Sequence, residues 1–133
     1  MQGDGALRQA VADLEGLGAG RVSPCAYHRI VAPGCAADGC LSFAYHAYGP
    51  AMDQLWSAFT AAGFEAAPAD YTAWLERTGN AHDPARIAQM DREDLMMLLL
   101  AIRRGERFAE GHWAAMLDRG VFLAIGRRLL ELN

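Results

Sequence analysis

Three thiols and one imidazole lie close together in the first third of the sequence. Cys25, His28, Cys35 and Cys40 fall within sixteen residues. Four such ligands on a hairpin and its turn can close a tetrahedral zinc site, which predicts a zinc-stabilised adaptor. Their order and long middle spacing differ from those of a zinc knuckle, and an unpaired cysteine is often a small core residue. The spacing favours this second alternative, in which the protein holds no cofactor.

A second group of chemically competent side chains lies where two predicted helices meet. The group consists of Arg103, Arg107, Glu110 and His112. Guanidinium forks bind carboxylate and phosphate groups. The group therefore predicts a binding site for a small molecule or an anion, or the active site of an enzyme, provided that at least two of these side chains converge in one pocket.

The same residues also have an ordinary structural explanation. Arg103 complements the negative end of the preceding helix, and Arg107 lies three residues before Glu110, the spacing of a surface ion pair. His112 shares a helix face with apolar residues, which is typical of a core histidine. On one continuous helix, Glu110 and His112 point about 200° apart and do not converge. The sequence favours this explanation and leaves the binding site open.

The sequence holds no motif of nucleophilic or nucleotide-dependent catalysis. It lacks the Gly-x-Ser-x-Gly elbow, the Walker loop and the His-Glu-x-x-His pair. Cys25 beside His28 or His46 is the only combination of thiol and base, and adjacent strand positions would have to converge for it to work. We therefore assign no catalytic residue and favour a protein that is not an enzyme.

Helical periodicity accounts for most of the chain. The predicted helices cover residues 7–17, 50–62, a short segment from 70 onward, 91–104, 106–119 and 121–132. Residues 95–102 are apolar in nearly every direction, which is typical of a central helix. Gly111 and Gly126 fall inside two of these helices, where glycine is unfavourable. They indicate sites where two helices approach closely.

One segment has the composition of strands. Residues 26–31 and 40–48 are rich in β-branched and aromatic side chains, and they flank the turn-forming stretch 32–39. They predict an antiparallel hairpin that packs against residues 95–102. The expected fold is therefore α+β and mainly α, a single domain over residues 1–133, with five or six helices and one N-proximal antiparallel hairpin.

The composition is that of one compact domain. The chain has 133 residues, of which 53% are hydrophobic and 21% charged, and its formal net charge is −4. This acidic balance gives no general reason to bind nucleic acid or an anionic membrane. The longest apolar run, 95–102, is too short to cross a bilayer, and the N-terminus has no secretory signal. We expect a cytoplasmic protein.

The C-terminal half resembles a known family. The stretch Arg103-Arg-Gly-Glu-Arg-Phe-Ala-Glu-Gly-His112 resembles the signature of a family of small bacterial proteins known as domain of unknown function 6508. Gly63-Phe64 is also similar, so that the resemblance covers about residues 41–132. It does not extend over residues 21–40, where the cysteines lie. The resemblance implies a helical C-terminal half and a bacterial origin, and it implies no reaction.

The balance of these observations favours a binding role. Many apolar and aromatic residues in a small chain without a catalytic constellation predict a protein-interaction module, which self-associates or binds a protein partner. An exposed apolar patch would be its sign. The anion or small-molecule site and the zinc-stabilised adaptor remain the alternatives.

Overall fold

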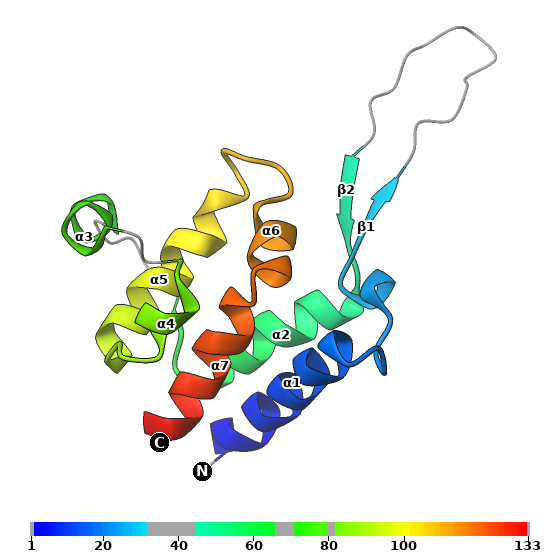
Figure 1. Ribbon diagram of the computed structural model, residues 1–133, viewed down its shortest axis with the longest axis horizontal. Helices are drawn as coiled ribbons and strands as arrows, with labels where there is room; N and C mark the ends of the chain where they lie inside the picture. Colours follow the sequence, from blue (N-terminus) through cyan, green and yellow to red (C-terminus); the bar gives the residue numbers. More distant parts are fainter. Residues whose placement is uncertain (1, 32–44, 66–70, 80–81, 133) are drawn as a thin grey trace, which may run out of the picture.

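The described residues form a helical bundle with one β-hairpin. The computed structural model describes residues 2–31, 45–65, 71–79 and 82–132 (Figure 1). In chain order the elements are α1 (Gln2–Gly18), the 3₁₀ turn η1 (Pro24–Ala26), β1 (His28–Val31), β2 (Tyr45–Tyr48), α2 (Pro50–Ala61), α3 (Tyr71–Thr78), α4 (Pro84–Ile87), α5 (Arg92–Gly105), α6 (His112–Asp118) and α7 (Val121–Leu132). The expected mainly helical α+β fold with an N-proximal hairpin is confirmed, and the short α4 was not predicted.

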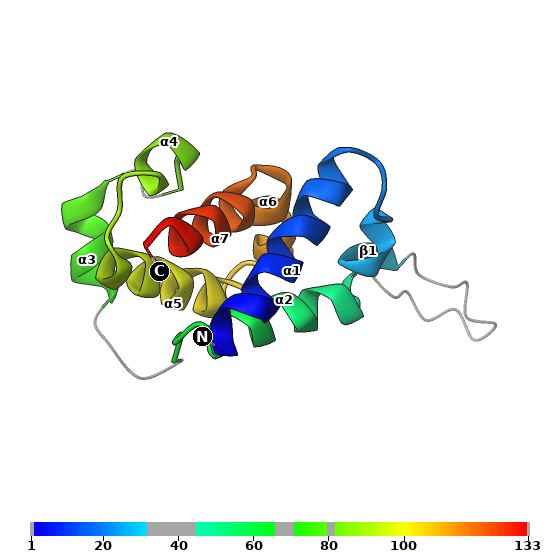
Figure 2. The same ribbon diagram turned by 90° about the horizontal axis from the view of Figure 1, so that it is seen from below.

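Three helices make one side of the bundle. α1 lies beside both α2 and α7, and the first turn of α1 is close to the last turn of α7 (Figures 1 and 2). A Cβ atom at Gly126 of α7 would lie 2.7 Å from Cγ2 of Val11. The prediction of close approach at Gly126 is therefore confirmed, because any side chain there would push α1 away from α7.

The apolar helix α5 is central, as its composition predicts. Asp91 caps it by accepting a hydrogen bond from the backbone N–H of Asp94 at 2.8 Å. The helix contacts α3, α6 and α7. Its buried residues lie on several sides of the axis: Leu95, Leu98, Leu99, Leu100, Ala101 and Ile102. α3 and α4 lie at the end of the molecule away from the hairpin (Figures 1 and 2).

The hairpin rests on the segment that follows α5. The strands are antiparallel and pair His28 with Tyr48 and Ile30 with His46, so these four side chains share one face of the ribbon. The tertiary contacts of this face are with Glu106, Glu110, Gly111 and Trp113. The expected packing against residues 95–102 is replaced by this contact, since the hairpin meets the bundle beyond the end of α5.

The helix predicted over residues 106–119 is shorter in the structure. α5 ends at Gly105, turns follow, and α6 begins only at His112. Gly111 has φ +86°, which side chains other than glycine rarely adopt, and a Cβ there would lie 2.7 Å from the His46 ring. Gly111 thus permits a turn against the hairpin rather than the close approach of two helices. Phe108, expected on an apolar face, is 82% exposed.

Candidate functional site

Arg103 and Arg107 converge on one cavity. Arg103 lies in the last turn of α5 and Arg107 in the turns that follow. Together with Arg104, Glu106 and Trp113 they line a cavity of about 430 Å³, which we call the cationic cavity. Two of the four side chains proposed from the sequence therefore face a common space.

Aromatic rings hold one of these arginines in place. The Cζ atom of Arg103 lies 5.1 Å from the ring centroid of Trp56 and 5.4 Å from that of Trp113, within the range of a cation–π contact. The two indoles are themselves 5.3 Å apart. Trp113 is fixed further by its Nε1–H, which donates to the carbonyl oxygen of Ile102 at 2.9 Å. Packing against these two rings thus fixes the position of the Arg103 guanidinium.

Glu106 joins the hairpin to the cavity. Its carboxylate accepts hydrogen bonds from the Tyr48 hydroxyl at 2.6 Å, from the Gly111 N–H at 2.9 Å and from the Trp113 N–H at 3.0 Å. Burial, followed by the hydrogen bond to Glu106 and the charge of that carboxylate, raises the pKa of Tyr48 well above its ordinary value. Tyr48 therefore remains a donor at physiological pH.

Sequence reasoning missed Glu106 and Tyr48 as members of the site. Glu106 is the fourth residue of the family-like stretch that begins at Arg103, but no pattern in the sequence assigned its side chain to the site. The two residues are 58 positions apart, and only the hairpin fold brings them together. The sequence offered one signal: Tyr48 lies in the predicted strand 40–48, and Glu106 lies in the family-like stretch 103–112.

Positive groups outnumber negative ones among the described residues of the cavity lining. These residues contribute three guanidinium groups and one carboxylate, which is a formal charge of +2. Arginine stays protonated at any physiological pH. The cavity is therefore a concentrated positive site in a chain whose net charge is −4, and its chemistry fits an anion.

The sequence belongs to a recognised family. It matches the model of the Family of unknown function (DUF6508) over residues 23–133. The chain belongs to this family. The match begins earlier than the resemblance over residues 41–132 indicated, and it includes the segment with the three cysteines. No curated protein and no solved structure matches the chain. All five residues of the cationic cavity lie inside the family match.

Glu110 and His112 lie outside the cationic cavity. A carboxylate oxygen of Glu110 accepts a hydrogen bond from the backbone N–H of His46 at 2.9 Å, so this side chain holds the hairpin instead of pairing with Arg107. The ring of His112 covers Gly105, where a Cβ would lie 2.5 Å from its Cδ2 atom. The four proposed residues therefore lie in three different places: two at the cationic cavity, one against the hairpin and one over Gly105.

His112 forms a half-buried pair with His82. Their ring centroids are 6.1 Å apart and the rings are nearly perpendicular. Burial lowers the pKa of His112, against the opposing charge of Glu106. Burial, and then the positive charges of His112 and Arg119, lowers the pKa of His82. Both rings therefore favour the neutral form at neutral pH.

The proposed zinc ligands fall partly outside the described residues. Cys35 and Cys40 belong to the segment 32–44, which the structure does not describe. Cys25 is exposed, and the Nε2 atom of His28 lies 2.6 Å from Nδ1 of His46 in a hydrogen bond between the rings. Within the described ranges, no three His, Cys, Asp or Glu side chains are arranged to hold a metal ion. Zinc binding stays a prediction.

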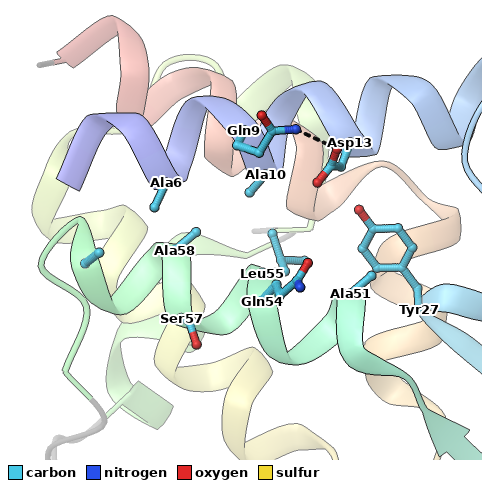
Figure 3. A pocket seen from close by; sticks show the side chains of 11 residues that line it. Ala6, Gln9, Ala10, Asp13, Tyr27, Ala51, Gln54, Leu55, Ser57 and Ala58 are labelled. Atoms are coloured by element: carbon cyan, nitrogen blue, oxygen red, sulfur yellow. Dashed lines mark hydrogen bonds between the residues drawn. The ribbon is translucent and has the colours of Figure 1, made fainter. Parts of the chain in front are cut away.

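A second cavity in this family member lies between α1 and α2. It measures about 550 Å³, and alanines from both helices line much of it, with Gln9, Asp13, Tyr27 and Gln54 around them (Figure 3). The Tyr27 hydroxyl points toward Asp13, which is hydrogen-bonded to Gln9 at 2.9 Å. We call this space the apolar groove. α1 lies before the first residue of the family match, so one wall of the groove is outside the matched residues.

Among the described helices, none has the length and hydropathy needed to cross a membrane.

Proposed function

We propose that this protein binds a small anionic ligand, a phosphate or carboxylate compound, in the cationic cavity. The observation that carries the proposal is the convergence of Arg103, Arg104 and Arg107 on one space of about 430 Å³. Like charges that face each other lower the stability of the folded chain. A bound anion would remove that repulsion. Anion binding therefore explains why three arginines lie together, whereas helix stabilisation does not.

The net charge of the lining favours phosphate over carboxylate. A formal charge of +2 matches the dianion of a phosphate monoester more closely than a single carboxylate. Guanidinium groups also present paired N–H donors that fit phosphate oxygens. Glu106 already accepts three hydrogen bonds, which suits a residue that shapes the cavity wall more than one that accepts a proton from substrate. We therefore assign the site to binding rather than to catalysis.

The test is a titration with inorganic phosphate followed by calorimetry or by amide chemical shifts. The wild type is expected to bind, and Arg107→Ala is expected to weaken binding about tenfold, since a hydrogen bond to a charged group contributes about 1.5–3 kcal/mol. Arg107 is exposed in a turn, so this change leaves the fold intact. Arg21→Ala is the matched control, because Arg21 is an exposed arginine remote from the cavity lining.

Two results would contradict the proposal. In the first, the wild type shows no saturable response to phosphate. In the second, Arg107→Ala and Arg21→Ala weaken the response equally, which would show that phosphate follows net charge rather than the cavity. Circular dichroism of each variant confirms that the fold is retained.

A second candidate function is association with a protein, either a partner or another copy. Three large apolar side chains are exposed on the hairpin and on the turns after α5: Phe108 at 82%, Ile30 at 62% and Tyr45 at 52%. Ile30 and Tyr45 belong to the hairpin, and Phe108 belongs to the turns that the hairpin contacts through Glu110. Light scattering over a concentration series tests self-association. Phe108→Ser is expected to reduce any association, whereas a constant monomer mass would rule out a homo-oligomer.

A further inference from the structure

A third cavity shares Arg103 with the cationic cavity. Asp53, Ser57 and Thr60 line it from α2, together with Trp56 and Arg103, and its volume is about 380 Å³. We call it the polar cleft. The three polar residues are four and three positions apart, so they share one face of α2. Since Arg103 lines both spaces, the polar cleft and the cationic cavity adjoin each other across one guanidinium group.

The polar cleft offers unused hydrogen-bonding groups. In the part of the chain that the structure describes, the side chains of Asp53 and Ser57 have no hydrogen-bond partner, and both are exposed. The Thr60 hydroxyl donates to the carbonyl oxygen of Trp56 at 3.0 Å, which leaves its oxygen free to accept. A carboxylate and two hydroxyls suit a ligand body that carries several hydroxyl groups.

A buried donor in the wall is also without a partner. Trp56 is only 5% exposed, and its Nε1–H makes no hydrogen bond among the described residues. Phe59, Phe64 and Phe122 surround the indole, so none of these neighbours offers an oxygen to it. A buried N–H that stays unpaired is costly and uncommon. Trp56 also lines the polar cleft, so a ligand bound there would lie next to this indole.

We infer that the ligand is a phosphorylated polyol, such as a sugar monophosphate. This inference rests on the proposed function: the cationic cavity holds the phosphate group, and the polar cleft holds the hydroxyl-bearing body. Arg103 lies between the two and donates to both parts. A purely apolar body is disfavoured because it would bury the Asp53 carboxylate without a partner.

The experiment compares inorganic phosphate, glucose, glucose 6-phosphate and phenyl phosphate as titrants of the full chain. Glucose 6-phosphate is expected to bind at least fivefold more tightly than inorganic phosphate, and glucose alone much more weakly than either. In the double variant Asp53→Asn/Ser57→Ala, the ratio of the two phosphate affinities is expected to fall toward one. Gln54→Ala is the matched control for the groove: Gln54 lies on the same helix and lines the apolar groove but not the polar cleft, whereas Ser57 lines both spaces.

A second readout reports on the buried donor directly. Glucose 6-phosphate is expected to shift the indole N–H resonance of Trp56 more than inorganic phosphate does, because phosphate alone affects this ring only through Arg103. Trp56→Phe assigns the resonance, because it removes the N–H and keeps an aromatic ring.

The outcomes separate this inference from the proposed function. Equal affinities for glucose 6-phosphate and inorganic phosphate, or tighter binding of phenyl phosphate, would overturn the assignment of the polar cleft while the cationic cavity remains an anion site. The polar cleft also loses its assignment if the double variant and Gln54→Ala change the affinity ratio equally. Absence of binding by all three phosphates would overturn both proposals.

Discussion

The cationic cavity and the apolar groove are similar in volume and opposite in origin. The groove measures about 550 Å³ and forms where two helices with alanine-rich faces pack together. Small side chains let helix axes approach, so the lining residues of the groove are explained by packing. The cavity measures about 430 Å³, and its described lining residues all come from the segment 103–113 and include three arginines.

This difference separates residues that the fold explains from residues for which we propose a ligand. In the groove, Leu55 is 2% exposed and belongs to the hydrophobic core, so the groove floor cannot change without loss of stability. In the cavity, Arg103 and Arg107 are exposed, and like charges on neighbouring side chains do not stabilise a fold. The following predictions test this separation, beginning with the largest effect.

Leu55→Ala is expected to lower the free energy of unfolding by about 3 kcal/mol, a value typical of replacing a buried leucine with alanine. The reason is the cavity left in the core below the groove. Urea denaturation measures the change. Leu132→Ala is the control, because Leu132 is 40% exposed and its loss should cost less than about 0.5 kcal/mol. Equal effects of the two changes would mean that the groove floor is not part of the core. Phosphate affinity should be retained in both variants.

Glu106→Gln is expected to lower stability and to strengthen anion binding at the same time. The change weakens three hydrogen bonds to a charged acceptor, and a stability loss of about 2 kcal/mol follows. It also removes the negative charge that Glu106 contributes to the described cavity lining, so phosphate affinity should rise about two- to fivefold. Denaturation and phosphate titration measure the two effects.

Glu110→Gln is the matched control for that prediction. Glu110 accepts a hydrogen bond from the His46 N–H and lies outside the cavity lining. A stability loss of about 1 kcal/mol or less is expected, with phosphate affinity unchanged. A rise in affinity for both variants would show that long-range charge governs binding, and it would remove the distinction between the cavity and its surroundings.

Acid sensitivity should come from neither cavity but from the pair His82 and His112. Burial lowers the pKa of both rings in the folded protein, so the unfolded chain binds more protons just below the ordinary histidine pKa. The stability contribution is complete above that ordinary value, about 6.5, and it is lost as the pH falls below it. The double variant His82→Gln/His112→Gln should therefore lose less stability between pH 7.5 and 5.5 than the wild type. Urea midpoints across this range measure the difference, and parallel curves for the two proteins would refute the assignment.

Local periodicity was sufficient for most of the fold. α7 spans residues 121–132 as predicted, because its apolar residues recur on one face and Gly120 ends the preceding segment. The same holds for the capped helix α5. The segment 106–111 was predicted as helix and is not, since its backbone is held by contacts with a hairpin that is distant in sequence. Local propensity carries no information about such contacts.

The candidate site divides along the same line. Arg103 and Arg107 lie on the two sides of the predicted helix junction and reach one cavity, so their closeness in sequence was enough to group them. Glu110 and His112 come after the end of α5 at Gly105. The directions predicted for their side chains assumed one continuous helix over residues 106–119, so they do not apply. Tyr48 enters through tertiary structure alone. A sequence can therefore nominate the arginines, but the residues that shape their cavity depend on the hairpin.

The smallest effect is the most direct test of why the arginines converge. If Arg107 serves only the fold, Arg107→Gln should lower stability or leave it unchanged. If it serves a ligand, its removal relieves repulsion from Arg103 and Arg104, and the ligand-free variant should be more stable by a few tenths of a kcal/mol. The gain should disappear at about 1 M salt, where the screening length is only about 3 Å. In saturating phosphate the wild type should become the more stable of the two proteins, because the wild type alone recovers binding free energy at the cavity.

Thermal denaturation under these three conditions measures the difference in stability. Arg21→Gln, which replaces an arginine outside the cavity lining, should show no such reversal. A loss of stability in Arg107→Gln without ligand would place this arginine with the groove residues, as part of the fold.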